Sequence, residues 1–156
     1  MKNINNMPGH LIRRFHQISV AVFHAEVCDA GFDLTPVQFA ALASIKDNPG
    51  IDQATLAGLI AYDRTTITGV VDRLVHKGLI TRQVSDADRR ARMLHVTDDG
   101  RDVLRKVTPA VEAVQEIMMC GLNDDEAEEL MRLMHKATVA VNDLSRAPQR
   151  DAESNK

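Results

Sequence analysis

Arginine and threonine side chains between residues 64 and 73 have the chemistry needed to read the edges of DNA bases. They are Arg64, Thr65, Thr66, Thr68 and Arg73. A threonine can contact a base through its hydroxyl or methyl group, whereas an arginine can bind guanine with two hydrogen bonds or hold a phosphate. The apolar residues of the same segment recur at helical spacing, namely Ile67, Val70, Val71 and Leu74. One face of this helix is therefore expected to pack on a core, and the opposite face is left for solvent or for DNA.

A second group of cations lies in the turn between residues 85 and 92, which contains Arg89, Arg90 and Arg92. Residues 79–84 and 93–96, on either side, are β-branched and alternate in polarity, so they predict a hairpin with this turn at its tip. Three arginines crowded at a tip call for an anionic partner, and the minor groove of DNA is one. Asp88 is expected to hold the turn in shape by pairing with a nearby arginine. A turn that is merely charged and solvated is the alternative.

The overall composition is that of a single domain built mainly from helices. The chain has 156 residues, of which 44% are hydrophobic and 3% aromatic, a size that suits one core rather than two. The net charge is −3, but residues 64–92 carry +4, residues 1–63 carry −2 and residues 93–156 carry −5. Positive charge is thus concentrated where phosphate would be approached. With no apolar run of membrane-spanning length and no leader pattern, we expect a cytoplasmic protein.

Neither catalysis nor metal binding is expected from the remaining reactive residues. Cys28 and Cys120 lack the spacing of a zinc or redox motif, and we expect them to be buried, inert thiols. Glu112 and Glu116 form an i, i+4 pair, yet no nucleophile, metal triad or nucleotide fingerprint accompanies them. We therefore expect no enzyme, no cofactor and no metal site. A regulator that senses oxidants through Cys28 or Cys120 remains an alternative.

Local capping signals place the arginine and threonine face within a helix-turn-helix. Thr35, Pro36 and Gln38 combine an N-cap, a proline at the first helical position and a capping box, so a helix is expected to run to about residue 46. Asp52 can begin a short helix over residues 53–60, and Asp63 can begin the helix of residues 64–77. Two short helices in succession, followed by a hairpin, are typical of a winged helix-turn-helix.

Longer helices are expected on both sides of this unit. Residues 8–30 carry an apolar stripe and end at Gly31, and Thr97 begins a helix to about residue 119 that Pro109 should bend or divide. A capping box at Asn123 and Glu126 opens a last helix, and the polar tail of residues 144–156 is expected to be disordered. Apolar residues of the last two helices need partners, which predicts a dimer: Val107, Val111, Val114, Ile117, Met118, Leu130, Met134 and Val141. If these helices instead folded back onto their own domain, the protein would be a monomer.

These motifs together resemble the MarR family of transcriptional regulators over residues 8–143. The family's wing pattern is matched by Asp86, Asp88, Arg89, Arg90, Thr97 and Gly100. The segments 34–39, 71–74 and 77–80 are also similar to the family. The resemblance implies a mainly α fold with a small β-hairpin, in which residues 34–100 form a winged helix-turn-helix lobe. It also implies that residues 8–30 and 101–143 are dimerisation helices, and that the homodimer binds an inverted repeat in double-stranded DNA.

Many members of the family are repressors that a small aromatic acid or phenol releases from DNA, which the resemblance implies as an expectation here. The first helix offers basic side chains for a carboxylate, and Phe39 offers an apolar wall: His10, Arg13, Arg14, His16 and Phe39. An arginine can bind a carboxylate with two hydrogen bonds. The alternative is that these arginines pair across a dimer interface and that the histidines are structural. A winged helix used only for protein interaction is a further alternative, which the exposed threonines and arginines disfavour.

Overall fold

The protein is mainly helical, with one small antiparallel sheet. In a computed structural model, residues 3–84 and 92–151 are described. The helices are η1 (Ile4–Asn6), α1 (Pro8–Asp29), α2 (Pro36–Asp47), α3 (Gln53–Leu59), α4 (Arg64–His76), α5 (Asp98–Met119), α6 (Asp124–Ala140) and η2 (Asn142–Leu144). The strands are β1 (Ile51–Asp52), β2 (Ile80–Val84) and β3 (Arg92–Val96). The expected fold class, mainly α with a small hairpin, is confirmed.

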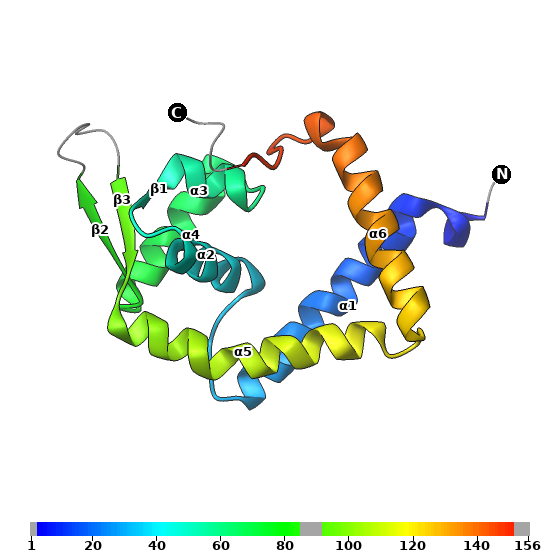
Figure 1. The fold of residues 1–156 in the computed structure, drawn as a ribbon, viewed down its shortest axis with the longest axis horizontal. Coiled ribbons are helices and arrows are strands. Elements are labelled where there is room, and N and C mark those ends of the chain that lie inside the picture. The colour runs from blue at the N-terminus through cyan, green and yellow to red at the C-terminus, as the bar shows by residue number, and fades with distance from the viewer. Residues whose placement is uncertain (1–2, 85–91, 152–156) are drawn as a thin grey trace.

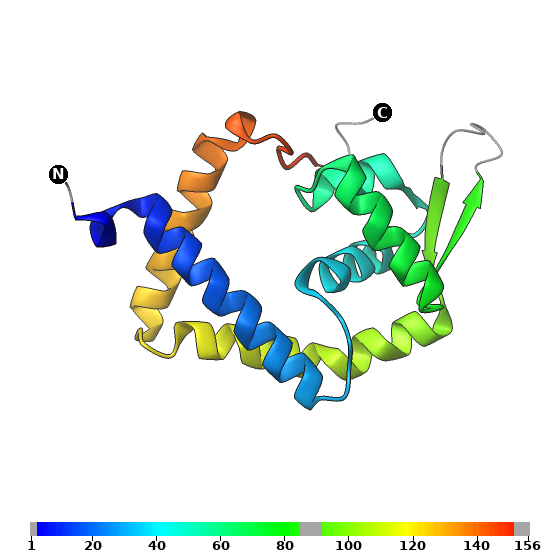
Figure 2. The same ribbon diagram turned by 180° about the vertical axis from the view of Figure 1, so that it is seen from behind.

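The elements are arranged as a ring. Helices α2, α3 and α4 and the sheet form a compact lobe, and α5 runs from this lobe along one edge of the molecule to α6 (Figure 1). Helix α1 packs against α5, as the reverse view also shows (Figure 2). The chain beyond α6 returns to α3, so that the ring closes (Figure 1).

Side-chain caps set the helix starts where the sequence predicts them. The Gln38 amide donates to Thr35 Oγ1 and the Thr35 amide donates to Gln38 Oε1, both at 3.3 Å, which confirms the capping box. Asp52, Asp63, Thr97 and Asn123 are the N-caps of α3, α4, α5 and α6. Gly31 and Gly78 follow α1 and α4 with φ of +83° and +71°, a conformation that glycine adopts without strain.

The hairpin is confirmed, and a third strand joins it. Strand β3 lies between β2 and β1, with Ile80 opposite Val96 and Ile51 opposite Leu94. Strand β1 has only two residues, too few for the alternation by which a strand is predicted. The sheet ties the start of α3 to the hairpin through backbone pairing.

The core of the lobe fixes the orientation of α4. Four residues of α4 are buried, as the spacing predicts: Ile67, Val70, Val71 and Leu74. They belong to one cluster with buried side chains of the other elements, among them Leu42, Ile45, Leu56, Ile80 and Leu94. The orientation of α4 therefore depends on packing from every element of the lobe.

Helix α5 continues through Pro109 without division. Val107 and Val114 are fully buried, and Val111 and Met118 pack against the core cluster. The prediction that all of these residues need a partner chain is wrong for Val107 and Val114, because the chain itself covers them, with α1 packed along α5. Ile117 remains exposed.

Among the described α-helices, α6 is the least covered. None of its residues is buried, and its exposed apolar side chains include Met131, Leu133, Met134 and Val139. Leu11, Ile12 and Ile18 of α1 are also exposed. Among residues 3–84 and 92–151, no helix has the length and apolar character that crossing a membrane requires.

The described part of the tail differs from the expected disorder. Residues 145–151, called the strap below, lie against α3: the Arg150 amide donates to the Gly58 carbonyl at 3.0 Å, and Gln149 Nε2 donates to the Leu59 carbonyl at 3.3 Å. Asn142 and Gln149 exchange two hydrogen bonds, at 2.8 and 3.0 Å. The polar composition of the tail predicted disorder, but these hydrogen bonds give several of its polar groups partners within the protein. Residues 152–156 lie outside the described chain.

Candidate nucleic-acid interface

Asp63 fixes the start of helix α4. Its carboxylate accepts hydrogen bonds from the Thr66 amide at 2.9 Å and the Thr66 hydroxyl at 2.6 Å. The hydrogen bond from the Thr66 hydroxyl, followed by that from the Thr66 amide, lowers the pKa of Asp63 below its usual value. In the turn before it, Ala61 has a φ of +55°, the one non-glycine residue with positive φ in the described chain. The entry into α4 is thus held in a specific geometry.

The predicted DNA-contacting side chains of α4 lie together on its exposed face, opposite the buried residues. They are Arg64, Thr65, Thr66, Thr68 and Arg73. Neither Arg64 nor Arg73 forms an ion pair with another described residue. Both guanidinium groups are therefore available for an external anion or base.

Two of the three threonine hydroxyls already serve inside the protein. Thr66 donates to Asp63, and Thr68 donates to the Arg64 carbonyl at 2.9 Å while it accepts from Gln53 Nε2 at 2.7 Å. Their methyl groups remain available for contact with a base, whereas the Thr65 hydroxyl forms no hydrogen bond to another described residue. The sequence interpretation did not include Gln53. Gln53 directly follows the Asp52 cap, so it is the first residue of α3, and this position could have indicated that its side chain reaches α4.

Arg82 connects α4 to the hairpin. Its guanidinium lies 2.9 Å from Asp72 of α4. Arg92 begins β3 and is exposed. Asp88, Arg89 and Arg90, the other residues predicted for the turn, lie outside the described residues. The Arg82 pair, which was not predicted, fixes the base of the hairpin against α4.

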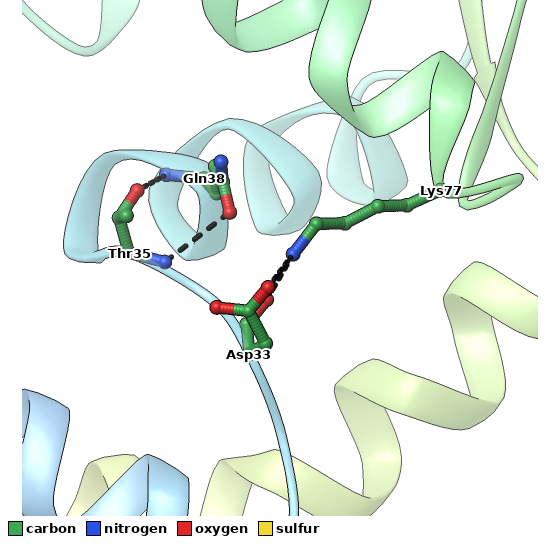
Figure 3. A network of polar contacts seen from close by, with 4 residues as sticks. All are labelled: Asp33, Thr35, Gln38 and Lys77. Carbon is green, nitrogen blue, oxygen red and sulfur yellow. Dashed lines mark hydrogen bonds and ion pairs between the residues drawn. The ribbon is translucent and has the colours of Figure 1, made fainter.

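The far end of α4 is anchored by Lys77, as Figure 3 shows. The Lys77 ammonium lies 2.8 Å from the Asp33 carboxylate and also donates to the Asp33 carbonyl. The hydrogen bond from Lys77, and then its charge, lower the pKa of Asp33. Asp33 lies in the link between α1 and α2, beside the capping box of Thr35 and Gln38. Lys77 is thus used to hold α4 in place, whereas Arg64 and Arg73 form no ion pair with another described residue.

The five residues predicted for an acid pocket are not brought together. A cavity of about 560 Å³ lies between α1 and α6, and its lining is apolar except for His16 and Ser19: Leu11, Ile12, Phe15, His16, Ser19, Leu130 and Met134. Of the five, only His16 lines this cavity. Arg13 donates to Gln17 at 2.7 Å, and Phe39 packs against Phe23 with ring centroids 6.3 Å apart. His10 and Arg14 lie on α1 outside the lining.

The cysteines differ from the expectation. Cys28 and Cys120 are both exposed, so the prediction of buried thiols is wrong. Cys28 lies near the end of α1 and Cys120 is the C-cap of α5, positions where a helical pattern alone does not show which face is covered. Within residues 3–84 and 92–151, no three His, Cys, Asp or Glu side chains gather where they could hold a metal ion.

Comparisons with known proteins agree with this geometry. Residues 34–91 match the model of the MarR family. The HTH-type transcriptional repressor NicR of Pseudomonas putida is 31% identical over 134 residues, which cover 86% of this chain and 84% of NicR. The structure of Bordetella bronchiseptica BpsR, reported for the mechanism by which 6-hydroxynicotinic acid regulates its DNA binding, is 29% identical with a TM-score of 0.83, covering 88% of this chain and 97% of that one.

A further similar structure is that of the PcaV transcriptional regulator of Streptomyces coelicolor in complex with its natural ligand. It is 28% identical, with a TM-score of 0.83, and the match covers 90% of this chain and 98% of PcaV. The family match lies on the lobe that carries the exposed face of α4, and the structural matches extend over the flanking helices as well. This chain therefore belongs to the MarR family of winged helix-turn-helix transcriptional regulators.

Proposed function

We propose that this regulator binds an inverted repeat in double-stranded DNA as a homodimer and represses transcription until a small aromatic acid or phenol releases it. The observation that carries the proposal is the exposed face of α4, where Arg64 and Arg73 have no ion-pair partner among the described residues. A recognition helix reads bases from such a face once it lies in the major groove. Arg89, Arg90 and Arg92 are proposed to contact the minor groove beside it.

Helix α6 supports the homodimer. An α-helix with several exposed apolar side chains and no buried residue is stabilised mainly by packing that the single chain does not supply. A second copy offers the same apolar surface on α1 and α6, as two-fold symmetry requires. Two recognition helices then meet half-sites about one helical turn apart, about 34–36 Å.

The cavity between α1 and α6 supports a ligand of aromatic character. Its walls are apolar, and His16 supplies a hydrogen-bonding group at its edge. BpsR responds to an aromatic acid, and PcaV has a natural ligand. Arg13 and Arg14, which precede His16 on α1, and the nearby His10 are proposed to attract the carboxylate, and Phe39 to offer an apolar wall. A tenfold preference of the ligand for the conformation that cannot bind DNA contributes about 1.4 kcal/mol per site.

DNA binding tests the first half of the proposal. The protein is mixed with the DNA upstream of its own coding region at low and moderate salt, beside the variant R64A/R73A and the control R105A/K106A. Arg105 and Lys106 both pair with Asp102 on α5, so the control removes the same charge from another part of the molecule. We expect tight, salt-sensitive binding by the wild type and the control. R64A/R73A should lose at least tenfold in affinity, which corresponds to the loss of about one guanine or phosphate contact. Equal loss in both variants would show that only net charge matters.

Release by ligand tests the second half. Benzoate, its hydroxy derivatives and a pyridine carboxylate are added to the complex, with the neutral benzamide as the matched compound. We expect one of the acids to release the DNA, and H16A to raise the concentration required, because His16 lines the cavity. H24A is the matched control, because His24 is exposed on α1 and lies outside the cavity lining. Release by none of the acids, or equal sensitivity of H16A and H24A, would refute the acid site and leave DNA binding intact.

A further inference from the structure

The strap places two arginines beside the end of α4 that a helix-turn-helix protein inserts into the major groove. Its position is fixed by backbone bonding, because the Arg150 amide donates to the Gly58 carbonyl of α3 at 3.0 Å. Gly58 has no side chain, and a Cβ there would lie 3.4 Å from Arg150 Cβ. The strap therefore lies in direct contact with α3 at Gly58. Figures 1 and 2 both show the chain after α6 reaching α3.

A cavity of about 380 Å³ lies between the strap and the helix-turn-helix. Its lining is shared by α3, the turn, the start of α4 and the strap: Ala54, Thr55, Ala57, Gly58, Tyr62, Asp63, Arg64, Arg146, Ala147, Pro148, Arg150 and Asp151. Three arginines thus border one opening, together with two carboxylates. Asp63 already accepts two hydrogen bonds from Thr66, which leaves Asp151 as the other acid at the rim. The local excess of charge is positive.

The strap arginines differ from most cations of the flanking helices. Arg101, Arg105, Lys106 and Arg132 of α5 and α6 all pair with a neighbouring carboxylate. Arg146 and Arg150 are exposed, and neither forms an ion pair or a side-chain hydrogen bond with another residue in the described part of the chain. Like Arg64, they are available for an anion that approaches the start of α4.

We propose that Arg146 and Arg150 bind backbone phosphates of the DNA strand that borders the major groove occupied by α4. This inference rests on the proposed DNA binding. In helix-turn-helix complexes the N-terminal residues of the recognition helix contact bases while the first helix crosses the backbone. The strap lies against that first helix, α3, so its arginines face the phosphates that flank the reading site. Such contacts hold the protein in register and carry no sequence information of their own.

The dependence of affinity on salt measures these contacts directly. Binding is measured from about 50 mM to about 200 mM salt for the wild type, R146A/R150A and the control R105A/K106A. Each phosphate contact contributes about 0.9 to the slope of log affinity against log salt, so losing four contacts per dimer reduces the slope by about 3.6. Over this range the affinity of the wild type should therefore fall about 150-fold further than that of R146A/R150A. The control should keep the slope of the wild type.

A charge-conserving variant separates phosphate binding from a structural role. R146K/R150K should restore most of the salt slope, because lysine also binds phosphate as a point charge. The loss in R146A/R150A should be similar on operator and on unrelated DNA. If R146A/R150A has the same salt slope as the wild type, the inference is overturned while DNA binding stands. Tighter DNA binding by R146A/R150A would also overturn it, and would indicate that the strap inhibits DNA binding. If the wild type binds no DNA at low salt, the proposed function fails as well.

Discussion

Replacing Gly100 with alanine should destabilise the lobe at the point where the hairpin meets α5. A Cβ on Gly100 would lie 2.1 Å from the Leu79 carbonyl oxygen and 2.8 Å from Val96 Cγ1. The Leu79 carbonyl cannot move freely, because it accepts a hydrogen bond from the Thr97 amide at 3.0 Å. Inserting a methyl group into a packed site costs about 1–3 kcal/mol, and a clash with backbone belongs at the upper end, about 3 kcal/mol.

Urea unfolding at one fixed protein concentration measures this cost, because the stability of the proposed dimer would depend on concentration. We expect a lower midpoint at an unchanged m-value, and a thermal midpoint about 6–12 °C below that of the wild type for a chain of this size. Gly69→Ala is the matched control: Gly69 lies within α4, and a Cβ there meets no atom within 4 Å. Alanine should stabilise that helix by about 0.5–1 kcal/mol. A Gly100→Ala protein as stable as the wild type would refute the argument.

Three further perturbations test how the recognition helix is held. Ile67→Ala should cost about 2–5 kcal/mol in urea unfolding, since Ile67 is fully buried in the core of the lobe; a smaller cost would show that the site collapses around the change. Lys77→Met should raise the pKa of Asp33 towards 3.8, as measured by NMR titration. Because the pKa of Asp33 is lowered in the folded protein, the Lys77–Asp33 pair stabilises the fold at pH values above the usual pKa of aspartate. This stabilisation is lost as the pH falls through the lowered pKa. Asp63→Ala should weaken operator binding and Asp63→Asn should preserve it, because asparagine also caps a helix. Equal binding by both variants would show that the cap of α4 does not contribute to DNA binding.

Most of the lobe could be predicted from the sequence, because its signals are local. The capping box at Thr35 lies within four residues, and the spacing of the apolar residues in α4 decides which of its faces is buried. Strand β1 exists only through its pairing with β3, and no local pattern of two residues reveals that. The strap was mistaken for disorder because composition does not show that the Arg150 amide can reach a carbonyl of α3.

The candidate site also divides into features with local sequence signals and features that depend on how the elements pack. The exposed face of α4 was predictable from periodicity, whereas the engagement of the Thr68 hydroxyl with Gln53 depends on how two helices pack. The acid pocket was predicted from residue types along α1, and the structure separates them: His16 lines the cavity beside α6, and Phe39 packs on Phe23. The burial of Val107 in α5, and the exposure of Cys28, likewise depend on which elements lie across which face.

Because the strap closes the ring, the lobe is joined to the rest of the molecule at three places: the link between α1 and α2, the start of α5, and residues 145–151. Each further attachment removes directions in which the lobe can turn. The hydrogen bonds of Gln149 and Arg150 to α3 therefore couple the position of the lobe to that of α6. The orientation of α4 is in this way set partly by a segment some ninety residues away from α3 along the sequence.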